Sequence, residues 1–127
     1  MGKLIFICSG GAAGALLRYL VSGFVYRHVS GVFPWGTLAV NLMGSVAIGF
    51  LWAVFDSIVG LENTRDLLLV GLLGAFTTFS TFNLENFHLL RDGEYGMVLL
   101  NIGLSNGAGI ALVFAGFLLF RLLLIRW

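Results

Sequence analysis

Charged residues are scarce in this chain. Only 10% of its 127 residues are charged, against 59% hydrophobic residues, and the mean hydropathy is +1.01. Ordinary soluble domains carry about 25% charged residues, so this composition excludes that class and predicts a membrane protein. The net charge of +1 offers no basic patch, and we therefore expect no nucleic-acid partner.

Cysteine and proline are almost absent, with one residue of each. The lone Cys8 cannot form an internal disulfide, and in its apolar surroundings a packed thiol is commoner than a redox or metal site. The histidines, His28 and His88, lie far apart at the ends of apolar runs. Neither a metal-ligand cluster nor a catalytic signature occurs in the sequence, and we do not expect an enzyme.

The apolar runs predict an all-α membrane protein with four transmembrane helices. One span needs roughly 20 residues, so residues 1–127 form a single transmembrane domain without room for a catalytic or nucleotide-binding domain. The polar interruptions place the spans at about 4–26, 34–55, 67–90 and 95–121. Any energy for transport must come from a gradient.

The first span carries an arginine and no acidic residue. Arg18 shares a helical face with Gly10, Gly14, Ser22 and Tyr26, which recur every four positions. Small residues permit close helix packing, so this face directs Arg18 into the protein rather than into lipid. Because a charge inside a membrane needs a partner, we expect Arg18 to be a structural anchor near one end of the span.

Polar residues also recur every four positions in the second and fourth spans. Thr37, Asn41 and Ser45 form one stripe, and Asn101 and Ser105 form another. The carboxamide of Asn41 must find a partner inside the membrane. An interhelical hydrogen bond is its commoner role, and donation of an N–H to a passing anion is the functional alternative.

One stretch of the third span fits an ordinary membrane helix poorly. Residues 71–82 read GLLGAFTTFSTF, and their hydroxyls can compete for backbone hydrogen bonds. We expect the helix to break near Gly74 to Thr77, where the freed backbone must face protein, water or an ion. The alternative is a continuous, glycine-kinked helix. Glu85 follows as an interfacial carboxylate or as a partner for Arg18.

Positive charges show only a weak preference for one side of the membrane. With four spans, one side of the membrane carries Lys3, Arg65, Arg121 and Arg126. The opposite side carries Arg27 and Arg91. Four against two is a weak positive-inside signal and is compatible with insertion in both orientations. Because four helices cannot easily enclose a polar pathway, we expect a homodimer with twofold symmetry.

Three motifs resemble signatures of the Fluc (CrcB) fluoride channels. They are GGAAGALLRY at 10–19, GTLAVNLMG at 36–44 and GAFTTFSTF at 74–82, and the last is the most specific. The likeness spans all four predicted helices. It implies a small microbial channel in the inner (plasma) membrane that lets fluoride leave the cytoplasm passively. It also implies an antiparallel, dual-topology homodimer with two pores.

The resemblance assigns roles to individual residues. The pore positions that it implies are Asn41, Phe79, Phe82, Ser80, Thr81, Thr37 and Ser105. The backbone carbonyls of Gly74 and Thr77, given by both subunits, are expected to hold a structural sodium ion at the dimer centre. Neutral oxygens suit sodium rather than zinc, and phenylalanine edges can stabilise a dehydrated anion. Asn101 departs from the family, because some members have an aromatic residue there.

The main alternative function is that of a small four-helix exporter of lipophilic cations, or multidrug exporter. Such an exporter needs a deep carboxylate in its first span, where this chain has only Arg18 as a charged residue at depth. A structural membrane subunit is the third possibility, and the polar stripes on three spans argue against it. The expected partners are fluoride, a second copy of the chain and membrane lipid.

Overall fold

The computed structural model describes residues 2–125 and consists of helices joined by short connections. Its elements are α1 (Gly2–His28), α2 (Trp35–Ser57), α3 (Glu62–Arg65), η1 (Asp66–Leu73), α4 (Gly74–Phe76), α5 (Phe79–Arg91), α6 (Tyr95–Gly103), η2 (Leu104–Ala108) and α7 (Gly109–Ile125). The two η segments are π-helical. Arg126, one of the four positive charges predicted to share a membrane side, lies outside the described residues.

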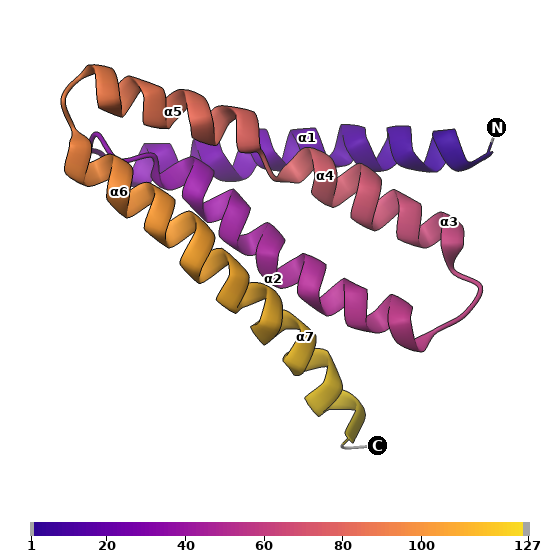
Figure 1. Ribbon diagram of the computed structural model, residues 1–127. Helices are drawn as coiled ribbons and strands as arrows, with labels where there is room; N and C mark the ends of the chain where they lie inside the picture. The colour runs from indigo at the N-terminus through magenta and orange to yellow at the C-terminus, as the bar shows by residue number, and fades with distance from the viewer. Residues whose placement is uncertain (1, 126–127) are drawn as a thin grey trace.

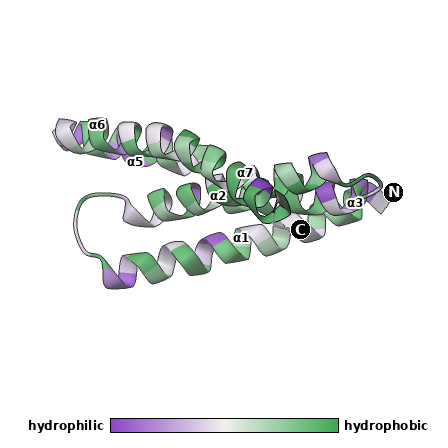
Figure 2. Cartoon of the chain, turned by 90° about the horizontal axis from the view of Figure 1, so that it is seen from below, coloured by the Kyte–Doolittle hydropathy of each residue, from purple (hydrophilic) through white to green (hydrophobic). Residues whose placement is uncertain are grey.

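Four helical segments are long and apolar enough to cross a membrane within the described part of the chain. They are Gly2–His28, Trp35–Ser57, Glu62–Arg91 and Tyr95–Leu124. Hydrophobic residues cover most of their length (Figure 2). The prediction of an all-helical membrane protein with four membrane-length helices is confirmed, so the chain is a multi-pass membrane protein.

Close backbone packing holds α1 against η1. A methyl group on Gly14 would collide with the backbone of Leu72, and one on Gly10 would collide with the carbonyl oxygen of Leu67. Figure 1 shows η1 and α4 running alongside α1. The small residues of α1 therefore serve as its contact face, and Arg18 on the same face is half-buried.

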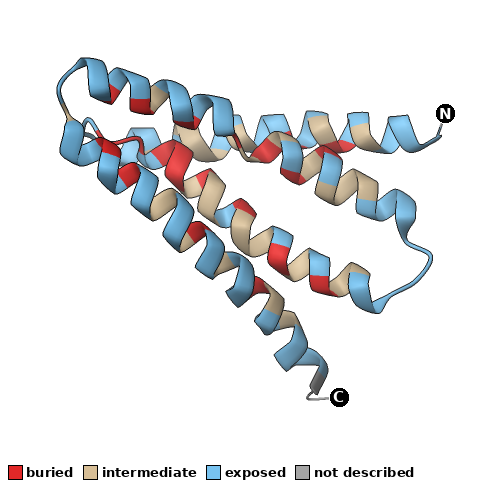
Figure 3. Cartoon of the chain, in the orientation of Figure 1, coloured by how far each residue is buried: buried red, intermediate tan, exposed pale blue. Residues whose placement is uncertain are grey.

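A second close crossing joins α2 to α7. Gly49 lies against the carbonyl of Val113, and Gly116 lies against the carbonyl of Val46. Buried positions follow these contact faces, whereas large hydrophobic side chains elsewhere are exposed (Figure 3). The single chain therefore has a thin core and wide apolar surfaces that water cannot cover favourably.

The backbone leaves helical geometry between α4 and α5. Thr77 has φ −80° and ψ 160°, and Thr78 has φ −150° and ψ 118°. Gly74, at the start of the stretch where the sequence predicts a break, keeps helical angles of φ −61° and ψ −34°. The N–H of Thr81 donates to Oγ1 of Thr78 at 3.3 Å, so Thr78 caps α5.

Candidate functional site

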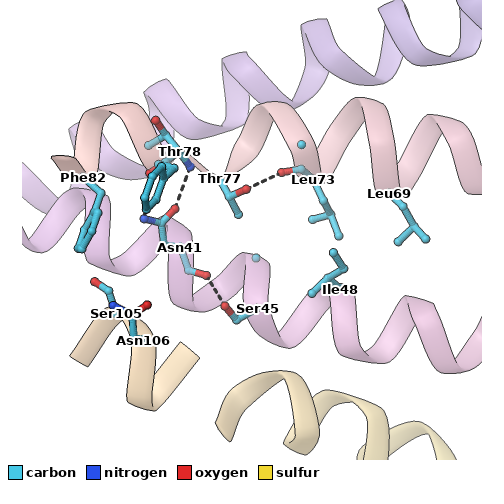
Figure 4. Close-up of a pocket in the computed structure, with 13 residues that line it drawn as sticks. Asn41, Ser45, Ile48, Leu69, Leu73, Thr77, Thr78, Phe82, Ser105 and Asn106 are labelled. Atoms are coloured by element: carbon cyan, nitrogen blue, oxygen red, sulfur yellow. Dashed lines mark hydrogen bonds between the residues drawn. The ribbon is translucent and has the colours of Figure 1, made fainter. Parts of the chain in front are cut away.

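A pocket of about 340 Å³ lies beside these two extended residues (Figure 4). Its lining residues come from α2, the third span and η2: Asn41, Gly44, Ser45, Ile48, Leu69, Leu73, Gly74, Thr77, Thr78, Phe79, Phe82, Ser105 and Asn106. None of these described residues carries a formal charge. The pocket therefore offers amides, hydroxyls, backbone groups and aromatic rings within an apolar protein.

Asn41 joins α2 to the extended backbone of the third span. Its Nδ2 donates to the carbonyl of Thr78 at 3.2 Å, and its Oδ1 accepts the N–H of Thr78 at 2.9 Å. The side chain thus satisfies both backbone groups of one residue, as a neighbouring strand would. Since Nδ2 carries two hydrogens, one N–H of Asn41 stays available on the pocket wall.

Two hydroxyls of the pocket bond to helical carbonyls. Oγ of Ser45 donates to the carbonyl of Asn41 at 2.9 Å, and Oγ1 of Thr77 donates to the carbonyl of Leu73 at 3.0 Å. Thr77 fits beside α2 because residue 44 is glycine: a methyl group there would collide with Cγ2 of Thr77. Gly44 therefore allows α2 to approach the interruption closely.

Phe79 and Phe82 stack on one another in the first turn of α5. Their ring centroids are 5.9 Å apart, and the ring planes differ by 26°. Phe82 is buried at 8% exposure, whereas Phe79 is 75% exposed although it lines the pocket. The pair leaves one large aromatic face uncovered by its own chain.

A series of side-chain hydrogen bonds joins two pocket-lining residues, Ser105 and Phe82, through Asn101 and Asn86. Oγ of Ser105 donates to Oδ1 of Asn101 at 3.3 Å, and Nδ2 of Asn101 donates to Oδ1 of Asn86 at 3.1 Å. Nδ2 of Asn86 then donates to the carbonyl of Phe82 at 2.9 Å. Asn101 is only 1% exposed, so this series of hydrogen bonds fixes α6 against α5 and orients the hydroxyl of Ser105.

Arg18 reaches the interruption from α1. Its Nη1 donates to the carbonyl of Thr77 at 3.5 Å, at the long end of the hydrogen-bond range. Meanwhile the N–H of Thr78, which an unbroken helix would direct to the carbonyl of Gly74, donates to Asn41 instead. The carbonyl of Gly74 has therefore lost its usual helical donor.

Glu85 lies in a separate polar cluster. Its Oε1 accepts hydrogen bonds from Oγ1 of Thr37 at 2.6 Å and from the hydroxyl of Tyr26 at 3.0 Å. Oε2 is buried and has no hydrogen-bond partner among the described residues. The cluster binds α1, α2 and α5 together. Of the two ion pairs found among the described residues, neither contains Arg18 or Glu85, so the two groups are not partners here.

The structure brings together some of the predicted site residues and not others. Those on the pocket wall are Asn41, Phe79, Phe82, Ser105, Gly74 and Thr77, and those that do not line it are Thr37, Ser80 and Thr81. The prediction of the site did not include Ser45, Thr78 and Asn106, which do line it. Ser45 belongs to the four-residue stripe of the second span, and Thr78 belongs to the hydroxyl-rich stretch. Asn106 lies one position off its stripe.

Comparison of the whole sequence with models of protein families gives a match that agrees with the sequence motifs. The model of the family described as "CrcB-like protein, Camphor Resistance (CrcB)" matches residues 5–117. The chain belongs to the CrcB family. The resemblance seen in the three sequence motifs is thereby confirmed.

Relatives in this family are named as channels. The chain is 43% identical over 124 residues to the "Fluoride-specific ion channel FluC" of Maridesulfovibrio salexigens, covering 97% of this chain and 98% of the relative. It is 45% identical over 122 residues to the protein of that name from Solidesulfovibrio magneticus, covering 95% and 98%. The Parabacteroides distasonis protein is 44% identical over 119 residues, covering 94% and 93%. The family is thus one of ion channels and not of enzymes.

Proposed function

We propose that this protein is a fluoride-selective channel that conducts the ion passively. The observation that carries the proposal is the uncharged pocket beside Thr77 and Thr78, where three membrane segments bring amides, hydroxyls and phenylalanines together. A fixed lysine or arginine on the wall would bind an anion too tightly to release it, whereas neutral donors and ring edges allow both entry and exit. The relatives named as fluoride channels support the same function.

The proposed direction of transport is out of the cytoplasm across the inner membrane. Hydrogen fluoride crosses membranes as the neutral acid and dissociates inside the cell, where the anion accumulates. A channel that lets the anion follow its gradient is then sufficient for export.

The proposed assembly is an antiparallel homodimer with two pores. The exposed face of Phe79 supports it, because a pocket-lining ring at 75% exposure needs another surface to complete its wall. The weak bias of positive charges, four against two, supports insertion in both orientations. Twofold symmetry would then give each copy an equivalent pocket, and hence two pathways.

Sodium is proposed as a structural ion at the dimer centre. The carbonyl of Gly74 fits this role because its helical donor is directed to Asn41, and a bare carbonyl in an apolar interior is costly. The carbonyl of Thr77 accepts Arg18, but a carbonyl has two lone pairs and can serve both groups. A bound sodium ion would coordinate the carbonyl oxygens that two facing copies bring together.

The alternative of a small multidrug exporter finds less support. Its chemistry needs a carboxylate that exchanges protons with cationic substrates, and α1 contains no acidic residue. Glu85, the acidic residue of α5, receives hydrogen bonds from Thr37 and Tyr26 outside the pocket. The direct test is efflux from liposomes measured with a fluoride electrode. Fluoride efflux with little chloride efflux is expected, and equal fluxes of the two anions would contradict selectivity.

A further inference from the structure

The hydroxyls on the pocket wall have no hydrogen left for an anion. A hydroxyl has a single hydrogen to donate. Ser45 and Thr77 use theirs on backbone carbonyls, at 2.9 and 3.0 Å. Thr78 donates to Oγ1 of Thr81 at 3.0 Å. Ser105 donates to Oδ1 of Asn101 at 3.3 Å. Each of these residues therefore presents lone pairs toward the pocket rather than a donor.

Ser105 cannot turn toward the pocket without loss. Its acceptor, Asn101, is 1% exposed and is itself held by Asn86 through a hydrogen bond of 3.1 Å. Rotating the hydroxyl would leave the buried Oδ1 of Asn101 without this partner. Leaving a buried acceptor unpaired costs more free energy than losing a hydrogen bond at an exposed site. Ser105, a predicted pore residue, is thus an unfavourable anion donor in this chain.

Carboxamides differ from hydroxyls because each has two N–H groups. Nδ2 of Asn41 commits one of them to the carbonyl of Thr78 at 3.2 Å. Nδ2 of Asn106 commits one to the carbonyl of Ile102 at 2.8 Å. Each side chain keeps a second N–H, and both side chains line the same pocket.

Asn106 occupies a position where its free N–H needs a partner. It lies in η2, inside the apolar segment Tyr95–Leu124, and its side chain is exposed at the pocket. Lipid cannot accept its hydrogen bond, and an unsatisfied polar group in hydrocarbon is costly. π-helical turns within α-helices are frequent at functional sites because they turn side chains out of the regular helical register.

We propose that Asn106 is a second anion-binding residue of this pocket, which donates its free N–H from η2 while Asn41 donates from α2. The inference rests on the proposed fluoride channel and adds to it a contact on the fourth span. Two carboxamides, each anchored by one hydrogen bond, would partly replace the hydration of a small anion without any fixed charge.

The test compares substitutions at Asn106 with one at Asn63, an exposed asparagine of α3, in the full-length protein. Asn106→Leu keeps similar bulk and removes the donor, and Asn106→Asp keeps size and polarity but replaces the donor with a negative charge. Fluoride efflux from liposomes should fall about tenfold or more in Asn106→Leu. The reason is that loss of one hydrogen bond to a charged group changes an equilibrium constant by roughly one to two orders of magnitude. Efflux should fall further in Asn106→Asp. The matched control, Asn63→Leu, makes the same substitution at an exposed residue of α3 that does not line the pocket, and its efflux should stay within about threefold of the wild type.

The outcomes separate this inference from the proposed function. Normal efflux in both Asn106 variants would overturn the role of Asn106 and leave a conducting wild type as a fluoride channel. A loss of efflux accompanied by a change in oligomeric size during gel filtration would also overturn it, by placing Asn106 in a contact between copies. Absence of fluoride efflux from the wild type would instead overturn the proposed function.

Discussion

Asn41 binds both backbone groups of Thr78, through hydrogen bonds of 3.2 Å to the carbonyl and 2.9 Å from the N–H. The two interpretations of Asn41 that the sequence leaves open are therefore compatible. One side of the carboxamide forms an interhelical bond, and the remaining N–H faces the pocket. The residue proposed to meet the anion is also the residue that holds the extended backbone in place.

We expect Asn41→Asp to lower fluoride efflux about a hundredfold or more. The carboxylate can still accept the N–H of Thr78, but it would repel both the carbonyl of Thr78 and an incoming anion. Asn63→Asp is the matched control, because Asn63 lies exposed in α3 away from the pocket. Equal efflux from the two variants would show that Asn41 does not contact the conducted ion.

Phe79→Ile and Phe82→Ile should each lower efflux about tenfold, because isoleucine keeps bulk but loses the electropositive ring edge. The two variants should differ in stability. Phe82 is buried, so its replacement should lower the free energy of unfolding by about 1–2 kcal/mol. Phe79 is exposed within its own chain, so its replacement should change the free energy of unfolding of that chain much less. Phe87→Ile, on the exposed side of α5, is the control for both measurements. Unchanged efflux in both test variants would remove the rings from the pathway.

Dual topology can be tested at Val59, which is 97% exposed in the connection between α2 and α3. The single native thiol is first removed by Cys8→Ser, and Val59→Cys is then introduced. A membrane-impermeant maleimide should label about half of the copies from each side if the two orientations are equally populated. Labelling from one side alone would falsify the antiparallel arrangement.

Sodium dependence can be tested by exchanging sodium for a large organic cation at constant ionic strength. If the carbonyls of Gly74 and Thr77 hold sodium between two copies, its exhaustive removal should lower both fluoride efflux and the thermal stability of the dimer. The sodium concentration is then restored as a control for irreversible damage. Undiminished efflux and stability in sodium-free buffer would eliminate the structural ion.

Close packing of α1 against η1 predicts different effects for two glycines of the same helix. A methyl group on Gly14 would collide with the backbone of Leu72, whereas one on Gly23 would meet nothing within 4 Å. Gly14→Ala should therefore lower the free energy of unfolding by about 2 kcal/mol or more. Gly23→Ala should change it by less than about 1 kcal/mol. Similar thermal unfolding of the two variants would contradict this packing.

The helical fold was predictable because its signals are local. Apolar runs of membrane length indicate the four long helices, and spacing by four places Gly10 and Gly14 on the face of α1 that packs against η1. The same spacing predicts that Arg18 points into the protein, where it contacts Thr77. These inferences need no knowledge of which helices are neighbours.

The pocket was only partly predictable because its partners depend on how the helices are aligned. No spacing rule relates Asn41 to Thr78, or Asn101 to Asn86, since these pairs join different helices. Asn106 was missed for another reason. A four-residue stripe selects Asn101 and Ser105, but the π-helical turn of η2 turns adjacent Ser105 and Asn106 to one pocket. A pattern that assumes a regular helix excludes one of them.

The bond between Asn41 and Thr78 also constrains the order in which the protein can be built. The backbone of Thr78 cannot remain unpaired in hydrocarbon, and its partner is supplied by α2 rather than by its own helix. During synthesis α2 precedes the third span, so the carboxamide of Asn41 is made before the backbone of Thr78 that it pairs with. A circular permutant that makes the third span before α2 would insert that span without its partner, and the span would have to wait at the membrane surface or refold later.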